Sequence, residues 1–208
     1  MRVSHDRTLI ANYNAYLKRE MAMIDKSLSP GRKVSQMHWG GGTPSYLTPD
    51  EIADVGAFIR ETFGFAEDIE ASVEIDPRGL TPEHVRAFAN AGFNRMSMGV
   101  QDFNLDVQRA INRVQSEQMS RDAVNWARSE GFTSVNLDLI YGLPHQTVES
   151  FAETVEKVID ISPDRIAVFN YAHVPWLKKH QELIKPEHLP SPDDRLLILQ
   201  RTIERQPT

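Results

Sequence analysis

Five polar side chains stand near the ends of short apolar runs, where together they could bind a polar ligand. Along three of these runs polar and apolar residues alternate, so that an amide or a carboxylate faces away from its apolar neighbours. A buried strand has little reason to end in a carboxylate unless something polar pairs with it. We therefore predict that the five side chains surround the mouth of one cavity, unless each caps the next helix or bonds a neighbouring loop. They are His38, Glu74, Gln101, Asp138 and Asn170.

A glycine triplet, Gly40 to Gly42, lies between a strand-like run and the pair Thr43 and Pro44. Three glycines remove side-chain bulk, so peptide N–H and C=O groups can approach a ligand closely. The spacing is not GxGxxG, and the Lys-Ser/Thr pair of a phosphate-binding loop is absent. A dinucleotide or a triphosphate is therefore not expected here, whereas a ligand with amine and carboxylate groups suits the exposed peptide groups.

Two further residues suit particular groups of a ligand. Arg113, which follows Asn112, can hold a carboxylate through two hydrogen bonds. Asp138 can accept hydrogen bonds from two hydroxyl groups, as from a ribose. A metal-dependent hydrolase that uses His38, Glu74 and Asp138 is an alternative, but such barrels usually offer paired histidines, and this chain has no HxH pair.

Composition narrows the classes of function. The chain has 208 residues, 23 lysines and arginines against 29 acidic residues, a net charge of -6 and no cysteine. Disulfides, thiolate zinc sites and cysteine nucleophiles are excluded within it. The acidic balance argues against binding to nucleic acid or to acidic membranes, and no apolar stretch is long enough to span a membrane. The start of the chain does not read as a signal peptide, so we expect a cytoplasmic monomer.

Apolar runs and amphipathic stretches alternate along the chain and must position these residues. Strand-like runs lie at 34–39, 71–76, 95–101, 134–141 and 165–171, and helical patterns at 49–63, 82–91, 105–130 with a break, and 148–161. Strands that alternate with crossover helices imply a parallel sheet, open or curved into a barrel. The polar strand ends favour the barrel, because the inner face of such a barrel becomes polar near its mouth.

No linker or low-complexity segment divides the chain, so we predict one domain over 1–208. Its parts are an opening helix within 1–30, βα units over 31–175 and a C-terminal helical segment over 176–208. Tyr13, Phe58 and Trp126 fall at helical spacing and are predicted to be core residues.

Six motifs together resemble one enzyme family. They are HWGGGTP, SVEIDPRGL, FNRMSMGVQDFN, VQRAINR, NLDLIYGLPHQT and FNYAHVP. The chain is similar through nearly its whole length to the oxygen-independent coproporphyrinogen III oxidases, which are radical S-adenosylmethionine (SAM) enzymes. GGGTP and YGLPxQT are shared across a wider group, whereas EIDPR, GVQDFN and the following INR separate this family from haem-chaperone-like relatives with EANP and GVQSF.

The resemblance implies an α/β fold, an incomplete parallel (β/α) barrel of about five βα units that lacks its first strand. It also implies a [4Fe-4S] cluster, an electron donor for that cluster, and two SAM molecules. In the family, a 5′-deoxyadenosyl radical takes hydrogen from a propionate of coproporphyrinogen III, and loss of CO2 leaves the vinyl groups of protoporphyrinogen IX. Carried over by position, the SAM-binding residues would be Gly41, Gly42, Thr43, Glu74, Gln101, Arg113, Asp138 and Ala172.

One departure from the family pattern affects the expected activity. The family holds its cluster through three cysteines in a CxxxCxxC motif, and this chain has no cysteine. Three thiolates leave one iron of such a cluster open to bind SAM. We therefore expect a fragment that lacks both the cluster-binding segment and a C-terminal domain, and that is inactive alone. A non-catalytic SAM- or porphyrin-binding module and a haem-chaperone-like relative are the alternatives.

Overall fold

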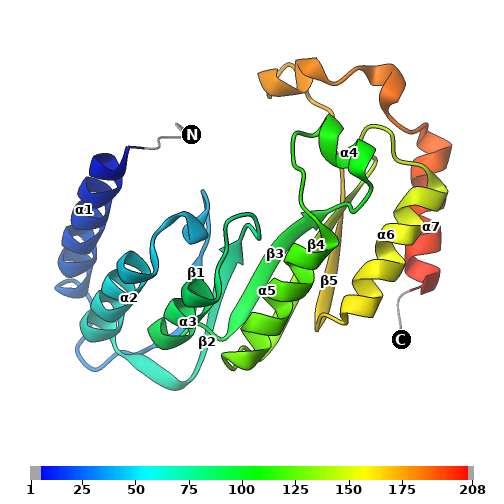
Figure 1. Cartoon of the computed structure of the whole chain (residues 1–208). Coiled ribbons are helices and arrows are strands. Elements are labelled where there is room, and N and C mark those ends of the chain that lie inside the picture. The colour runs from blue at the N-terminus through cyan, green and yellow to red at the C-terminus, as the bar shows by residue number, and fades with distance from the viewer. Residues whose placement is uncertain (1–5, 206–208) are drawn as a thin grey trace.

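Strands and helices alternate along the described residues, with two successive helices between the third and fourth strands. The computed structural model describes residues 6–205, and Figure 1 shows their arrangement. The strands are β1 (Val34–Trp39), β2 (Phe65–Ile75), β3 (Arg95–Gln101), β4 (Ser134–Tyr141) and β5 (Arg165–Asn170). The helices are α1 (Arg7–Asp25), α2 (Pro49–Phe63), α3 (Pro82–Ala91), α4 (Leu105–Ala110), α5 (Glu117–Ser129), α6 (Val148–Ile161) and α7 (Pro192–Arg205). Short 3-10 turns are η1 (Pro44–Tyr46), η2 (Lys179–Leu183) and η3 (Pro186–His188).

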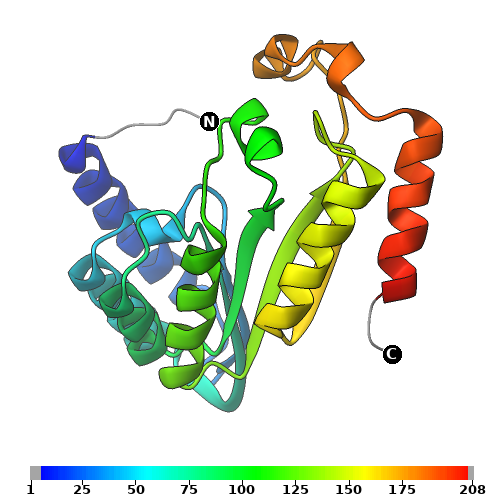
Figure 2. The same ribbon diagram turned by 45° about the vertical axis from the view of Figure 1, so that its right-hand side comes forward.

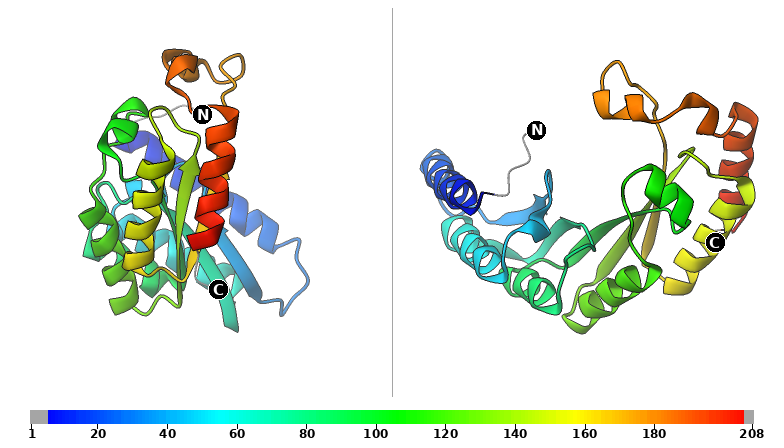
Figure 3. Two further views of the ribbon diagram at one scale, coloured as in Figure 1. Left: turned by 90° about the vertical axis from the view of Figure 1, so that its right-hand side faces the viewer. Right: turned by 45° about the horizontal axis from the view of Figure 1, so that its top comes forward.

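The five strands form one parallel sheet in the order β1-β2-β3-β4-β5. The sheet curves into half of a barrel, with the helices on its convex side and an open concave side (Figure 3). Because the strands are parallel and sequential, all their carboxyl ends lie at the same edge of the sheet. The predicted incomplete barrel is confirmed, and its polar strand ends are brought to one edge.

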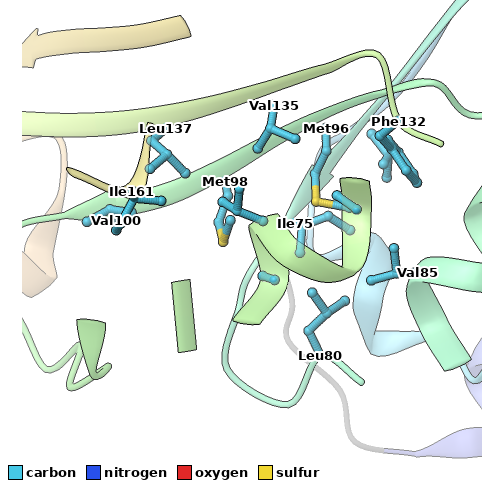
Figure 4. Close-up of a cluster of buried hydrophobic side chains, with 14 of the residues drawn as sticks. Ile75, Leu80, Val85, Met96, Met98, Val100, Phe132, Val135, Leu137 and Ile161 are labelled. Carbon is cyan, nitrogen blue, oxygen red and sulfur yellow. The ribbon is translucent and has the colours of Figure 1, made fainter. Parts of the chain in front are cut away.

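Alternation along the strands places the core between the sheet and the helices. In β4, Val135, Leu137 and Leu139 are fully buried, while Ser134, Asn136 and Asp138 are only partly buried. Figure 4 shows Met96, Met98, Val135 and Leu137 among the side chains of this core. Each such side chain contributes roughly 1.5–3 kcal/mol when buried. One strand face is therefore committed to packing, which leaves the other face to hold the site.

Polar side chains cap the first turns of several helices. Thr48 accepts a hydrogen bond from the N–H of Glu51, and the Glu51 carboxylate accepts one from the N–H of Thr48, which forms a capping box. Thr81 caps α3 in a similar way, and Ser116 caps α5. The predicted break within 105–130 is confirmed, because α4 ends before a loop and α5 begins after it.

Two expectations differ from the structure. Strand β2 begins at Phe65, not at residue 71, because its first half pairs with β1 outside the reach of β3. Tyr13 is 65% exposed, so its assignment to the core was wrong. Helix α1 packs against α2 at one end of the half-barrel, and its Tyr13 and Tyr16 stay exposed. Phe58 and Trp126 are partly buried, and Trp126 packs against the core.

The segment after β5 passes over the carboxyl ends of the strands before α7 returns along α6 (Figure 2). It contains η2 and η3, and α7 contributes Ile198 to the core. None of the helices in residues 6–205 is both long and apolar enough to span a membrane.

Candidate functional site

A cavity of about 290 Å³ opens where β2, β3 and β4 end. Peptide groups of the glycine loop form one side of it, and polar side chains of the three strands form the other. Its lining residues are Gly42, Thr43, Glu74, Ile75, Asp76, Ser97, Gly99, Gln101, Arg113 and Asp138. The carboxylates on neighbouring strands and the single arginine make this a polar, charged site.

The glycine loop lies against Glu74. The N–H of Gly41 donates to Oε2 of Glu74 at 3.3 Å, and Gly41 has the left-handed φ of +91° that glycine adopts without strain. A Cβ atom on Gly40 would stand 2.5 Å from Nε2 of His38 and 2.9 Å from the Glu74 carboxylate. A side chain at the first position would therefore displace His38 and Glu74, and the second position favours glycine for its backbone conformation.

His38 supports the same carboxylate from the neighbouring strand. Its Nε2 lies 3.4 Å from Oε1 of Glu74, and its Nδ1 lies 2.8 Å from the hydroxyl of Ser72. Both the His38 ring and the Glu74 carboxylate remain more than half exposed, so solvent screens their attraction. His38 orients Glu74 beside the cavity but does not line it.

Asp138 projects into the cavity from the middle of the site. The hydroxyl of Ser97 donates to its Oδ2 at 3.1 Å, and the side-chain amide of Asn136 donates to its Oδ1 at 2.6 Å. Burial raises the pKa of Asp138, the two hydrogen bonds lower it, and the charge of Glu74 raises it, with a net rise. Each carboxylate oxygen keeps acceptor capacity for a further donor, such as a hydroxyl group of a ligand.

Gln101 ends β3 in a left-handed conformation with φ +67°, next to an irregularity in the pairing of β3 with β4. Such a conformation costs a non-glycine residue of order 1 kcal/mol or more, and it is often found at functional sites. The buried amide oxygen of Gln101 has no hydrogen-bond partner within residues 6–205. Gln101 thus presents an unsatisfied acceptor at the edge of the cavity.

Arg113 reaches back from the loop after α4. Its guanidinium donates to the carbonyl of Gly99 at 2.9 Å and to Oδ2 of Asp76 at 3.2 Å, while its buried Nε has no partner within the part of the chain that is described. Burial lowers the pKa of Arg113 and the charge of Asp76 raises it, with a net fall. Arginine nevertheless stays protonated in proteins, so it can hold an anion here.

Asp76 is bound on two sides by arginines. Burial raises the pKa of Asp76. Hydrogen bonds from Arg78 and the charges of Arg113 and Arg78 together lower this pKa by more, so it lies below its ordinary value. Asp76 is therefore ionised, and it fixes the guanidinium of Arg113 at the edge of the cavity.

The structure brings together most of the residues that the sequence singled out. Gly42, Thr43, Glu74, Gln101, Arg113 and Asp138 all line the cavity, and Gly41 contacts Glu74 beside it. Ala172 and Asn170 lie outside the lining. Both are exposed, and the carbonyl of Ala172 accepts a hydrogen bond from Gln181 at 3.0 Å.

Four lining residues were missed from the sequence. Ser97 and Gly99 lie on the polar side of β3, Ile75 ends β2, and Asp76 directly follows it. The alternation that marked Glu74 and Gln101 also marks Ser97 and Asp76, so that signal was present. Gly99 could not be found in this way, because its role is to leave space: a Cβ there would stand 2.4 Å from Nε2 of Gln101. Within residues 6–205, no three histidine or acidic side chains form a group that could hold a metal ion.

Comparison with known proteins places the chain in a class. The Radical SAM superfamily pattern matches residues 11–158, and the chain belongs to that superfamily. An archaeal Elp3 structure from Methanocaldococcus infernus shares the fold, with a TM-score of 0.65 over 96% of this chain and 52% of that one, at 14% identity.

The similarity is much higher to oxygen-independent coproporphyrinogen III oxidases. The Helicobacter pylori enzyme is 50% identical over 192 residues, which cover 92% of this chain and 42% of that protein. The Escherichia coli enzyme is 53% identical over 179 residues, which cover 85% of this chain and 38% of that protein. The solved structure of coproporphyrinogen III oxidase from Escherichia coli has a TM-score of 0.93 and 47% identity, over 98% of this chain and 46% of that one. The chain thus spans less than half the length of these relatives.

Proposed function

We propose that this chain forms the SAM-binding part of an oxygen-independent coproporphyrinogen III oxidase, an enzyme that decarboxylates coproporphyrinogen III to protoporphyrinogen IX in haem biosynthesis. One observation carries the proposal: Glu74, Gln101 and Asp138 come from three neighbouring strands and line one cavity with the glycine loop. The identity of about half of all residues to enzymes of that name supports the choice of substrate.

The residues of the cavity fit SAM group by group. Its ammonium and sulfonium are cationic, so Glu74 and the carbonyl groups of the glycine loop stabilise them. Asp138 accepts hydrogen bonds from ribose hydroxyls, and Arg113 attracts the carboxylate of the methionine part. The unsatisfied amide oxygen of Gln101 and the unsatisfied Nε of Arg113 are buried polar atoms that a polar ligand would complete.

A bound SAM supplies the oxidising chemistry by which hydrogen is taken from the substrate. This chain's residues bind and orient it. Asp76 holds Arg113 in place, and Ser97 and Asn136 fix the carboxylate of Asp138.

The residues present do not fit the iron–sulfur cluster that radical SAM enzymes use. A cluster of this type is held by thiolates, and the chain contains no cysteine. No electron-transfer step is therefore assigned to these residues. We infer that SAM binding is a property of this chain, whereas cleavage of SAM requires cysteines outside it.

Calorimetric titration with SAM tests the binding site. We expect SAM to bind the chain, and Glu74→Gln to weaken binding about tenfold, because one charged hydrogen bond is lost. Glu67→Gln is the matched control, since Glu67 is exposed on the same strand far from the cavity, and it should bind as the parent does. Absence of heat, or equal affinity of both variants, would contradict the proposed site.

A chimera tests the substrate. The matching segment of the Escherichia coli oxidase is replaced by this chain, so that the host protein supplies the cluster-binding cysteines. We expect the chimera to decarboxylate coproporphyrinogen III under anaerobic conditions. A chimera that holds its cluster and binds SAM but leaves coproporphyrinogen III unchanged would show that this segment serves another substrate.

A further inference from the structure

Arg113 reaches the cavity from the loop 111–116, which lies between α4 and α5 (Figure 1). Neither a helix nor a strand fixes the path of this loop, and Asn112 within it has a left-handed φ of +53°. An arginine side chain has many rotamers, and its guanidinium stays in one place only if the backbone that carries it is also held. Other contacts must therefore hold this loop.

One buried glutamine closes the loop. Gln108, in α4, is 3% exposed, and its side-chain amide donates to the carbonyl of Gln115 at 2.7 Å. Its Oε1 accepts the N–H of Gln115 at 3.2 Å, so the amide binds the peptide groups of Gln115 as a neighbouring strand would. The backbone carbonyl of Gln108 also accepts the N–H of Arg113 at 2.8 Å. Gln108 therefore holds both the residue that carries the guanidinium and the end of its loop.

The loop is also fixed to the end of β3. Nε2 of Gln108 donates to the carbonyl of Asp102 at 2.8 Å, and Nε2 of Gln115 donates to the carbonyl of Gly99 at 3.3 Å. Arg113 donates to the same carbonyl of Gly99 at 2.9 Å. Both glutamines are buried, and a buried backbone group that loses its partner costs more than an exposed one. These contacts hold the loop at a fixed distance from the strand end.

We propose that Gln108 is a positioning residue for Arg113: it holds the loop so that the guanidinium meets the carboxylate of the bound ligand. The inference rests on the proposed function, in which that carboxylate belongs to SAM. Gln108 does not line the cavity, so it acts through Arg113 and not on the ligand itself. The contact of a guanidinium with a carboxylate through two hydrogen bonds depends on geometry, so a displaced loop would keep the charge and lose the contact.

Titrations with SAM and with decarboxylated SAM test this role. The second compound keeps the sulfonium, the ammonium and the ribose but lacks the carboxylate. Gln108→Met keeps the length of the side chain and removes its hydrogen bonds. We expect this variant to bind SAM roughly tenfold more weakly and decarboxylated SAM as the parent does, because only the carboxylate contacts Arg113. Equal losses for both compounds, or no loss for either, would overturn the inference.

Gln146→Met is the matched control for stability. Gln146 is 4% exposed, and its amide likewise bonds two backbone groups, the N–H of Leu143 and the carbonyl of Ile140. These partners belong to β4 and the loop after it, not to the loop 111–116. We expect a fall in Tm similar to that of Gln108→Met, without a change in the ratio of the two affinities. The same changed ratio in both variants would show that Gln108 has no specific role.

A combination with Arg113→Ala measures the coupling of the two residues. If Gln108 acts through Arg113, Gln108→Met should weaken SAM binding in the parent but not in Arg113→Ala, where the guanidinium is already absent. Additive losses in the double variant would contradict the positioning role.

The guanidinium can also be followed without any ligand. Nε of Arg113 is buried, so NMR of the parent chain should show its N–H protected from exchange with water. Gln108→Met should remove this protection, and Gln146→Met should keep it. A chain that shows this pattern but does not bind SAM would contradict the proposed function and support the positioning role. A chain that binds SAM and stays protected in Gln108→Met would overturn the positioning role alone.

Discussion

The backbone N–H of Gly41 donates to Oε2 of Glu74 at 3.3 Å, which ties the loop after β1 to the end of β2. The contact joins residues from adjacent parallel strands, and it points a peptide group and a carboxylate at the same cavity. Such a contact fixes the glycine loop without any side chain of its own. The loop thus remains narrow enough for a ligand to reach its peptide groups.

Gly40→Ala should impair ligand binding more than folding. The added Cβ would stand 2.5 Å from Nε2 of His38 and 2.9 Å from the Glu74 carboxylate, so both side chains must move. Because both are more than half exposed, they can move at little cost in stability. We expect SAM affinity to fall about tenfold with a small change in Tm. A large fall in Tm with unchanged affinity would argue against the assigned role of Glu74.

Gly56→Ala should destabilise the fold through the contact of α2 with α3. A Cβ on Gly56 would stand 2.4 Å from Cβ of Ala91, in the tight packing between these helices. We expect a loss of about 1–3 kcal/mol in the free energy of unfolding, which urea denaturation measures. Ala91→Gly in the same chain should recover part of this loss, because it restores the space. If the double variant is no more stable than Gly56→Ala, close packing at this point is not the cause.

Asp138→Asn should weaken SAM binding about tenfold, because one charged acceptor for ribose hydroxyls is lost. Burial and the charge of Glu74 give Asp138 a net pKa above the ordinary value. SAM affinity of the parent should therefore fall as the pH is lowered through this raised pKa, at a higher pH than for an exposed aspartate. Calorimetry as a function of pH measures this step, which Asp138→Asn should lack and Asp68→Asn, on the exposed part of β2, should keep.

Asp102→Asn should lower stability at neutral pH. The fully buried carboxylate accepts hydrogen bonds from the N–H of Asn104 at 2.6 Å, from the hydroxyl of Thr154 at 2.8 Å and from the amide of Gln146. In Asp102→Asn, one carboxylate oxygen becomes an NH2 group, which cannot accept a hydrogen bond from the donor that faces it. We expect the free energy of unfolding to fall by about 1–3 kcal/mol.

The pH dependence of stability gives a second readout for Asp102. Burial raises its pKa, and the hydrogen bonds lower it less, so the net pKa in the folded chain is above the ordinary value. The folded state then binds more protons than the unfolded state between the two pKa values, and this carboxyl group stabilises the fold increasingly as the pH falls through its folded pKa. Urea denaturation at several pH values should show this contribution in the parent chain and not in Asp102→Asn. An identical pH profile for both would contradict a raised pKa.

Local patterns were enough to predict the elements that hold the site. The alternation in β4 and the helical pattern over 49–63 each depend on a few neighbouring residues, and both are confirmed. Tyr13 shows where such patterns fail. Helical spacing says which residues share a face but not whether another element covers that face, and the face of α1 that carries Tyr13 stays exposed.

The candidate site also depends partly on local sequence patterns and partly on the tertiary structure. Because side chains alternate along a strand, the sequence alone determined that Glu74, Gln101 and Asp138 lie on the polar faces of parallel strands. Only the tertiary structure decided which of them meet, because the curvature of the sheet and the pairing of neighbouring strands set the distances between strand ends. The tertiary structure joined Arg113 and Asp76 at the cavity, because the loop that carries Arg113 returns to the end of β2. It left Asn170 outside the cavity, because Asn170 ends β5 at the edge of the sheet.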